Sequence, residues 1–97
     1  MSKPFFEKPI LEIDDIEQPA VAYAQRRGWI IEKVVSQSRK GWPDRTCIRK
    51  GRVMFVEFKR PGGQLSAIQV KRIKELRAAG AEVHVIDNLE AAYELFR

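Results

Sequence analysis

One hairpin-like stretch decides the fold: Arg45-Thr46-Cys47-Ile48-Arg49-Lys50-Gly51-Arg52-Val53-Met54-Phe55-Val56-Glu57-Phe58. It contains two strand-like runs, residues 45–49 and 52–58, separated by Lys50-Gly51, a pair suited to a two-residue hairpin turn. If these two residues form the turn, the numbers of cross-strand partners sum to 101. Asp44, directly before the first run, then lies opposite Glu57. The sequence therefore predicts an antiparallel hairpin with two facing carboxylates at its open end.

The hairpin lies within the predicted order helix, three strands, helix, strand, helix. The periodicity of apolar residues predicts helices over residues 13–27, 66–79 and 89–96 and further strands over residues 29–35 and 82–86. Pro19 fits a first turn better than a helix interior, so we expect the regular first helix to begin only near Glu17. The second helix crosses over and brings the fourth strand beside the others. This order predicts an α/β fold with a mixed central sheet flanked by helices.

Length and composition limit the chain to a small globular protein. With 97 residues there is room for one modest core, and we expect residues 1–12 to form an N-terminal arm and residues 13–97 a single domain. The hydrophobic fraction of 44% and the charged fraction of 32% are ordinary for a soluble protein. We find no apolar run that could span a bilayer and no signal sequence. The single cysteine, Cys47, predicts a protein of the reducing cytoplasm.

Positive charge is concentrated in the middle of the chain. Residues 39–77 contain twelve Lys and Arg and three acids, which gives this block a net charge of +9 and the remainder −4. Such a block favours a polyanionic partner, most commonly nucleic acid, although a solvated basic face remains an alternative. Two of the three acids are Asp44 and Glu57. Their isolation indicates a purpose other than surface charge balance.

Two carboxylates and one ammonium group are predicted to converge at the open end of the hairpin. Side-chain alternation places Glu57 and Lys59 on one face, with Asp44 across the ladder. The cluster can share a proton, use Lys59 as a counter-ion, or hold a divalent cation such as Mg²⁺ or Mn²⁺, which prefers oxygen ligands. A solvent-facing hairpin end that only keeps the edge soluble remains open. Against that alternative, the charges interrupt an apolar segment where burial normally excludes them.

Four further residues are candidates for a site, namely Gln69, Glu17, His84 and Cys47. Gln69 adjoins the inward stripe of the second helix, where it either reaches the cluster or is a boundary residue at the sheet rim. Glu17 lies on the inward stripe of the first helix, where it either meets an interior partner or interacts with the helix dipole. His84 lies within an alternating strand and is interpreted as structural. Cys47 lies mid-strand on the face opposite Asp44, which favours a small buried residue over a nucleophile.

The combination of these motifs resembles a known family. Gly41-Trp42-Pro43-Asp44-Arg45, then Phe55-Val56-Glu57-Phe58-Lys59-Arg60-Pro61-Gly62-Gly63-Gln64-Leu65-Ser66, and then Gln69 are similar to the VRR-NUC nucleases, a branch of the PD-(D/E)XK superfamily. The resemblance covers roughly residues 16–87. Pro-Asp and Glu-x-Lys are weak motifs alone, but their ordered combination is strong. The resemblance implies a restriction-endonuclease-like αβββαβ core.

The resemblance also implies an activity, that of a Mg²⁺- or Mn²⁺-dependent deoxyribonuclease. Asp44 and Glu57 would hold the metal, together with the main-chain carbonyl of Phe58. Lys59 would orient or activate the attacking water and stabilise charge on the scissile phosphate. Gln69 would support the lysine and the water. This chemistry agrees with what phosphodiester hydrolysis requires, a nucleophilic water and relief of negative charge.

The carboxylate that the family carries on its first helix is matched here by Glu17, as a further catalytic residue and metal ligand. Asp14 is the fallback. Pro19 is a departure from the family at that point.

The resemblance further implies the substrate and the assembly. Standalone members of this family typically come from phages or prophages. The resemblance to them implies that this chain forms a homodimer that acts in DNA replication and repair. Such a dimer would make paired cuts in branched DNA such as Holliday junctions. The apolar Phe5-Phe6 arm and a Tyr93-Leu95-Phe96 surface are candidates for the dimer contact. The alternative is a non-catalytic DNA-binding module of the same fold. The basic residues expected to follow DNA phosphates are Arg39, Lys40, Arg60, Lys71, Arg72 and Lys74.

Overall fold

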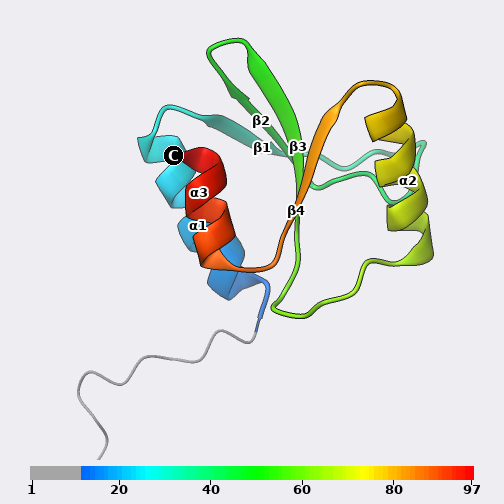
Figure 1. Ribbon diagram of the computed structural model, residues 1–97, viewed down its shortest axis with the longest axis horizontal. Coiled ribbons are helices and arrows are strands. Elements are labelled where there is room, and N and C mark those ends of the chain that lie inside the picture. Colours follow the sequence, from blue (N-terminus) through cyan, green and yellow to red (C-terminus); the bar gives the residue numbers. More distant parts are fainter. Residues whose placement is uncertain (1–11) are drawn as a thin grey trace, which may run out of the picture.

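The computed structural model describes residues 12–97. Along the chain, the elements are α1 (Asp14–Arg26), β1 (Ile30–Lys33), β2 (Arg45–Arg49), β3 (Arg52–Phe58), α2 (Ala67–Ala78), β4 (Glu82–Ile86) and α3 (Leu89–Phe96). Helices α1 and α3 cover one side of the sheet and α2 lies on the other (Figure 1). The predicted α/β architecture is confirmed. Residues 1–11, which include most of the predicted arm, lie outside the described part of the chain.

The sheet is mixed and has the strand order β1-β2-β3-β4. Strands β1, β2 and β3 are antiparallel neighbours, whereas β4 pairs in parallel with β3 after the crossover through α2. In the central hairpin Arg45 lies opposite Val56 and Arg49 opposite Arg52, so the predicted register is confirmed. Lys50 and Gly51 both have positive φ, 50° and 82°. A type I′ turn requires this conformation at both positions.

The main core lies between the sheet and the α1/α3 layer. Its buried members are Ile16, Ala20, Ala24, Trp29, Ile31, Cys47, Met54, Val56, Phe58, Ile86, Ala92 and Phe96. Because side chains alternate along β3, the burial of Val56 and Phe58 on this face turns Phe55 and Glu57 toward the α2 side. Cys47 is fully buried, and desolvation raises the pKa of its thiol to about 12. The prediction that it is a buried structural residue is confirmed.

The first helix begins earlier than predicted. It starts at Asp14 and continues through Pro19, so the expectation that regular helix begins near Glu17 was wrong. The main-chain N–H groups of Ile16 and Glu17 donate to the carbonyl of Ile13 at 3.0 and 2.8 Å, which closes the first turn. Proline in the second turn removes one hydrogen bond. Burial of Ile16 and Ala20 on the same side offsets that loss.

The other boundaries follow the predictions closely, except that β1 is shorter than residues 29–35. Trp29 lies before the strand because its main-chain N–H donates to the carbonyl of Ala24 at 3.0 Å. Its Nε1 donates to the carbonyl of Phe96 at 3.1 Å, and its ring packs edge-on against that of Phe96. Ser66 caps α2 as predicted. Within residues 12–97, no helix has the length and hydropathy needed to cross a membrane.

The predicted apolar surface of Tyr93, Leu95 and Phe96 is not formed as a whole. Phe96 is fully buried in the core, and Leu95 is half-buried against it. The ring of Tyr93 lies 4.7 Å from that of Tyr23 on α1. Most of the apolar stripe of α3 therefore packs within the same chain, and of the three residues only Tyr93, with 36% exposed, lies at the surface.

Candidate active site

The hairpin register brings two carboxyl groups into contact. Asp44 directly precedes β2, and Glu57 lies near the end of β3 with 5% of its surface exposed. The side chain and the main chain of Asp44 lie close enough to the Glu57 carboxyl to shift its pKa. The carbonyl of Asp44 accepts a 2.7 Å hydrogen bond from the N–H of Val34, which continues the β1–β2 pairing up to the site. The predicted approach of the two carboxylates is confirmed.

The environment of Glu57 disfavours its charged form. Burial is the main cause, followed by the hydrogen bond and the negative charge of Asp44, and together they raise the Glu57 pKa from 4.5 to about 8. The positive charge of Lys59 and the main-chain N–H of Asp44 act in the opposite direction. Without a cation, Glu57 therefore keeps its proton at neutral pH.

Gln69 is fixed at both ends of its amide group. Its Nε2 donates to Oε2 of Glu57 at 3.2 Å, and its Oε1 accepts a 2.9 Å hydrogen bond from the N–H of Ser66. Its own N–H donates to Oγ of Ser66 at 3.2 Å, which completes a capping box at the start of α2. The sequence left open whether Gln69 reaches the carboxylates or lies at the rim of the sheet. In the structure it reaches Glu57. Its partner there is Glu57, whereas the resemblance had implied the lysine and the water.

Lys59 follows directly after β3 and remains tied to the sheet. Its N–H donates to the carbonyl of Ile86 at 2.8 Å, which extends the β3–β4 pairing by one residue. The side chain is half-buried, and its positive charge lowers the Glu57 pKa. The charge of Lys59 therefore acts on the Glu57 carboxyl at the end of β3.

Glu17 is placed elsewhere. Its Oε2 lies 2.8 Å from Nε of Arg45, and both side chains are largely buried, with 9% and 17% exposed. Arg45 directs this contact to the α1 side of the sheet, opposite the α2 side that Glu57 faces. Residues 12–97 contain no group of three or more His, Cys, Asp or Glu placed to hold a metal. The structure thus gives Glu17 an interior partner and brings neither it nor the exposed Asp14 to the carboxylate pair.

The carboxylate pair fits a divalent cation by its chemistry. Mg²⁺ commonly uses one or two carboxylates and keeps several waters. Asp44 and Glu57 supply oxygen ligands whose repulsion a cation would relieve, since one of them is buried and retains a proton without it. Phe58 has its side chain in the core, but its main chain directly follows Glu57. These three residues are the ones that would hold the ion.

The predicted DNA contacts are mostly free to meet a ligand. Arg39, Lys40, Arg60, Lys71 and Lys74 are exposed. Arg72 differs from them, because only 8% of its surface is exposed. Its Nε donates to the carbonyl of Lys40 at 2.9 Å, and its Nη1 donates to Glu75. In this position Arg72 joins the loop before β2 to helix α2, which gives no support to its prediction as a phosphate contact.

Sequence reasoning missed two residues that support Asp44 from the loop. Gly41 has φ +79°, and a Cβ added there would lie 2.6 Å from the carbonyl oxygen of Ile68. The ring of Trp42 packs edge-on against that of Phe55, with 5.9 Å between centroids. The loop therefore rests on the first turn of α2 and on β3. The signal available beforehand was the position of Gly41-Trp42 directly before Pro43-Asp44.

This αβββαβ architecture, with a carboxylate pair and a lysine at the end of its central hairpin, defines a class of small α/β domains. Residues 12–88 match the VRR-NUC domain family, and the chain belongs to this family. It is 35% identical over 80 residues to a protein of Acyrthosiphon pisum secondary endosymbiont phage 1 named "Putative nuclease p44", covering 81% of this chain and 86% of that protein. A solved structure described as "VRR_NUC domain" is similar, with a TM-score of 0.68 and 26% identity, covering 81% of this chain and 91% of that one.

Proposed function

We propose that this protein is a divalent-metal-dependent nuclease that hydrolyses phosphodiester bonds in DNA. The observation that carries the proposal is the contact between the buried Glu57 carboxyl and Asp44, with Lys59 two residues further along. Isolated like charges at this spacing are destabilising, so a fold that retains them implies a ligand that binds both. Membership of the VRR-NUC family and similarity to a phage protein named as a nuclease support the same reaction.

Each residue of the site has a role that follows from its contacts. Asp44 and Glu57 hold the ion, and Gln69 orients the Glu57 carboxyl by occupying its Oε2. A bound divalent ion supplies an acidified water and offsets charge on the phosphate. Lys59 contributes a positive point charge at the same place, where it stabilises the phosphate or orients the water.

DNA is the proposed partner because the exposed basic residues lie around this site. Arg39 and Lys40 precede Asp44 in the loop, Arg60 follows Lys59, and α2 carries further exposed lysines. Such residues follow phosphates without reading bases, which favours recognition of DNA shape. Branched DNA, including Holliday junctions formed during repair, is the proposed substrate. The cytoplasm of a bacterial or phage-infected cell stays the predicted compartment.

A homodimer is also part of the proposal, now supported by a different surface from the one predicted. Ile30, Ile48 and Val53 are direct cross-strand neighbours on β1, β2 and β3. Their exposed fractions are 62%, 38% and 48%. An exposed apolar row across three strands is typical of an interaction site, and two copies meeting there would present two cutting centres to a junction.

Ile48→Lys tests this dimer contact. We expect light scattering after size exclusion to give the mass of a dimer for the wild type and of a monomer for the variant, because a charge in the middle of the row must be desolvated on association. Ile68→Lys is the matched control, since Ile68 has a similar exposure of 39% but lies on α2. A dimer that persists in Ile48→Lys would exclude this surface.

Lys59→Met tests the nuclease itself, because it removes the charge and keeps the aliphatic stem. The substrates are a fluorescent four-way junction, a flap and a plain duplex, each incubated with Mg²⁺, Mn²⁺ or EDTA. We expect the wild type to cut only with metal and the variant to cut at least about 100-fold more slowly. Lys33→Met, which removes an exposed charge from β1, is expected to retain the rate constant for cutting.

The rival function is a DNA-binding module that does not cut. It predicts that the wild type binds the junction but leaves it intact with every metal. Equal cutting by Lys59→Met and the wild type would likewise end the catalytic assignment of Lys59.

A further inference from the structure

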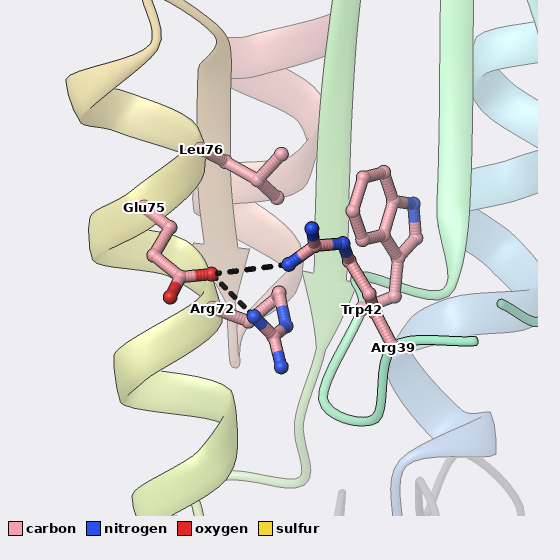
Figure 2. A pocket seen from close by; sticks show the side chains of 5 residues that line it. All are labelled: Arg39, Trp42, Arg72, Glu75 and Leu76. Atoms are coloured by element: carbon pink, nitrogen blue, oxygen red, sulfur yellow. Dashed lines mark hydrogen bonds and ion pairs between the residues drawn. The ribbon is translucent and has the colours of Figure 1, made fainter.

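A second feature lies beside the carboxylate pair and has no role in the reaction described above. It is a pocket of about 220 Å³ between helix α2 and the loop before β2, lined by Arg39, Trp42, Arg72, Glu75 and Leu76 (Figure 2). This volume is below the roughly 300 Å³ at which sites for drug-sized ligands begin. The pocket therefore suits a group about as large as one heterocyclic ring system.

The lining combines apolar walls with a polar side. Trp42 supplies an aromatic surface, and Leu76 supplies an aliphatic one from α2. The polar side consists of Glu75, which binds Arg72 and lies 3.9 Å from Nη1 of Arg39. Flat apolar faces with donors and acceptors along one edge are the chemical character of a nucleobase, which proteins hold by stacking and by hydrogen bonds to its edge.

Two of the polar groups differ in how firmly they are held. Arg72 is buried and bonded to both the carbonyl of Lys40 and Glu75, so it forms a fixed part of the lining. Arg39 is 61% exposed, and its 3.9 Å pair with Glu75 lies at the limit of an ion-pair contact. An exposed pair of this kind is weak, so the guanidinium can turn to an incoming base or its phosphate at little cost.

The pocket is connected to the carboxylate pair by direct contacts. The ring of Trp42 packs on that of Phe55, and Phe55 precedes Glu57 by two residues on the same face of β3, a separation of roughly 7 Å. On the other side, a Cβ at Gly41 would lie 3.1 Å from the N–H nitrogen of Gln69, whose amide group binds Glu57. These contacts place the pocket close to the carboxylate pair, on the same side of the sheet.

We propose that this pocket receives one unpaired nucleobase of the DNA strand that lies at the carboxylate pair. The inference rests on the proposed function and adds to it the feature of the substrate that is recognised. A base within a continuous duplex has both faces stacked and its edge paired, so only an unpaired base can present a face to Trp42 and an edge to Glu75 and Arg39. The pocket therefore selects DNA that contains unpaired nucleotides, such as bulges, flaps and open junctions.

The test places 2-aminopurine, a base whose fluorescence falls when it stacks, at the single unpaired position of a bulged duplex. Binding is measured in EDTA, so that no cutting occurs. With the wild-type protein we expect the emission to fall by about half or more, and the bulged duplex to bind on the order of tenfold more tightly than the continuous one.

Two variants eliminate the pocket, each by a change in a different wall. Trp42→Leu removes the stacking surface, and Leu76→Phe fills the space without touching Trp42. We expect both to lose the fall in emission and to bind the two duplexes with affinities within about twofold of each other. Val70→Phe places the same ring at an exposed position of α2 outside the pocket and is expected to behave as the wild type. Leu76→Phe keeps the test decisive if Trp42→Leu weakens the fold through lost contact with Phe55.

Three outcomes would overturn the inference. The wild type could bind both duplexes equally, the fall in emission could persist in Leu76→Phe, or the free 2-aminopurine deoxynucleotide could give the same fall at the concentration of DNA used. The third outcome would assign the pocket to free nucleotides. A protein that cuts junctions with metal but shows any of these results would lose the base pocket and keep the proposed function. A protein that shows the expected fall but never cuts would keep the pocket and lose the nuclease.

Discussion

Asp44→Asn is expected to abolish DNA cutting while raising the melting temperature of the metal-free protein. Asparagine keeps the size of the side chain and removes one of two carboxylates in contact. We expect the rate of cutting to fall by at least about 1,000-fold, because the proposed divalent ion would lose a charged ligand. We expect a gain of only about 1 kcal/mol in the free energy of unfolding, since burial, which remains, is the largest cause of the raised Glu57 pKa.

The pH dependence of this gain has a definite sign. A carboxyl whose pKa is raised from 4.5 to about 8 on folding destabilises the folded protein progressively across that interval and fully above it. The advantage of Asp44→Asn is therefore expected to be largest at pH 9, about 4–8 °C in melting temperature, and to shrink toward pH 5. Mg²⁺ or Mn²⁺ should raise the melting temperature of the wild type and have little effect on the variant.

Glu32→Gln provides the control for the loss of one negative charge, because Glu32 is an exposed residue of β1. It is expected to leave both cutting and the metal-induced rise in melting temperature as in the wild type. A metal response retained in Asp44→Asn would mean that the ion binds elsewhere.

Gly41→Ala is expected to be among the most damaging small substitutions in the chain. A Cβ at this position would lie 2.6 Å from the oxygen and 2.8 Å from the carbon of the Ile68 carbonyl, and both are backbone atoms that cannot move aside cheaply. The φ of +79° adds strain for any side chain. We expect a loss of about 3 kcal/mol in the free energy of unfolding and a fall of roughly 12–24 °C in the melting temperature.

Gly62→Ala separates the two causes. Gly62 has a similar φ of +71°, but an added Cβ would meet no atom within 4 Å. Its variant should therefore lose about 1 kcal/mol, from backbone strain alone. If the two variants melt at the same temperature, the contact between the loop and α2 contributes little. Cutting should fall in Gly41→Ala alone, since the loop with Gly41 is the one that positions Asp44.

The central hairpin and its register were predictable because a two-residue turn at Lys50-Gly51 determines which residues of the two strands lie opposite each other. From that register the meeting of Asp44 and Glu57 followed, and Ser66 marked the start of α2 correctly. The structure departs from the predictions where packing between distant segments decides. Pro19 stays inside α1 because its neighbours are buried in the core, which no local propensity reports.

The same limit applies to the charged residues. Arg72 and Glu17 look like surface or site residues in the sequence, yet each is held by a partner remote in the chain, the carbonyl of Lys40 for the first and Arg45 for the second. The packing of the helices on the sheet decides which charged residues form pairs. The periodicity of the sequence predicts only which side of a helix faces the core. The pocket beside Trp42 was unpredicted for this reason.

Because β3 pairs in parallel with β4, the sheet around β3 is completed late during synthesis of the chain. Strand β3, which carries Glu57, has only β2 as a neighbour until α2 and β4 have followed it in the chain. Gln69 and the carbonyl of Ile86 that binds Lys59 also belong to that later part. A growing chain on the ribosome therefore holds its carboxylates on an open sheet edge until β4 has emerged, and chains that end before β4 lack the contacts that position the site.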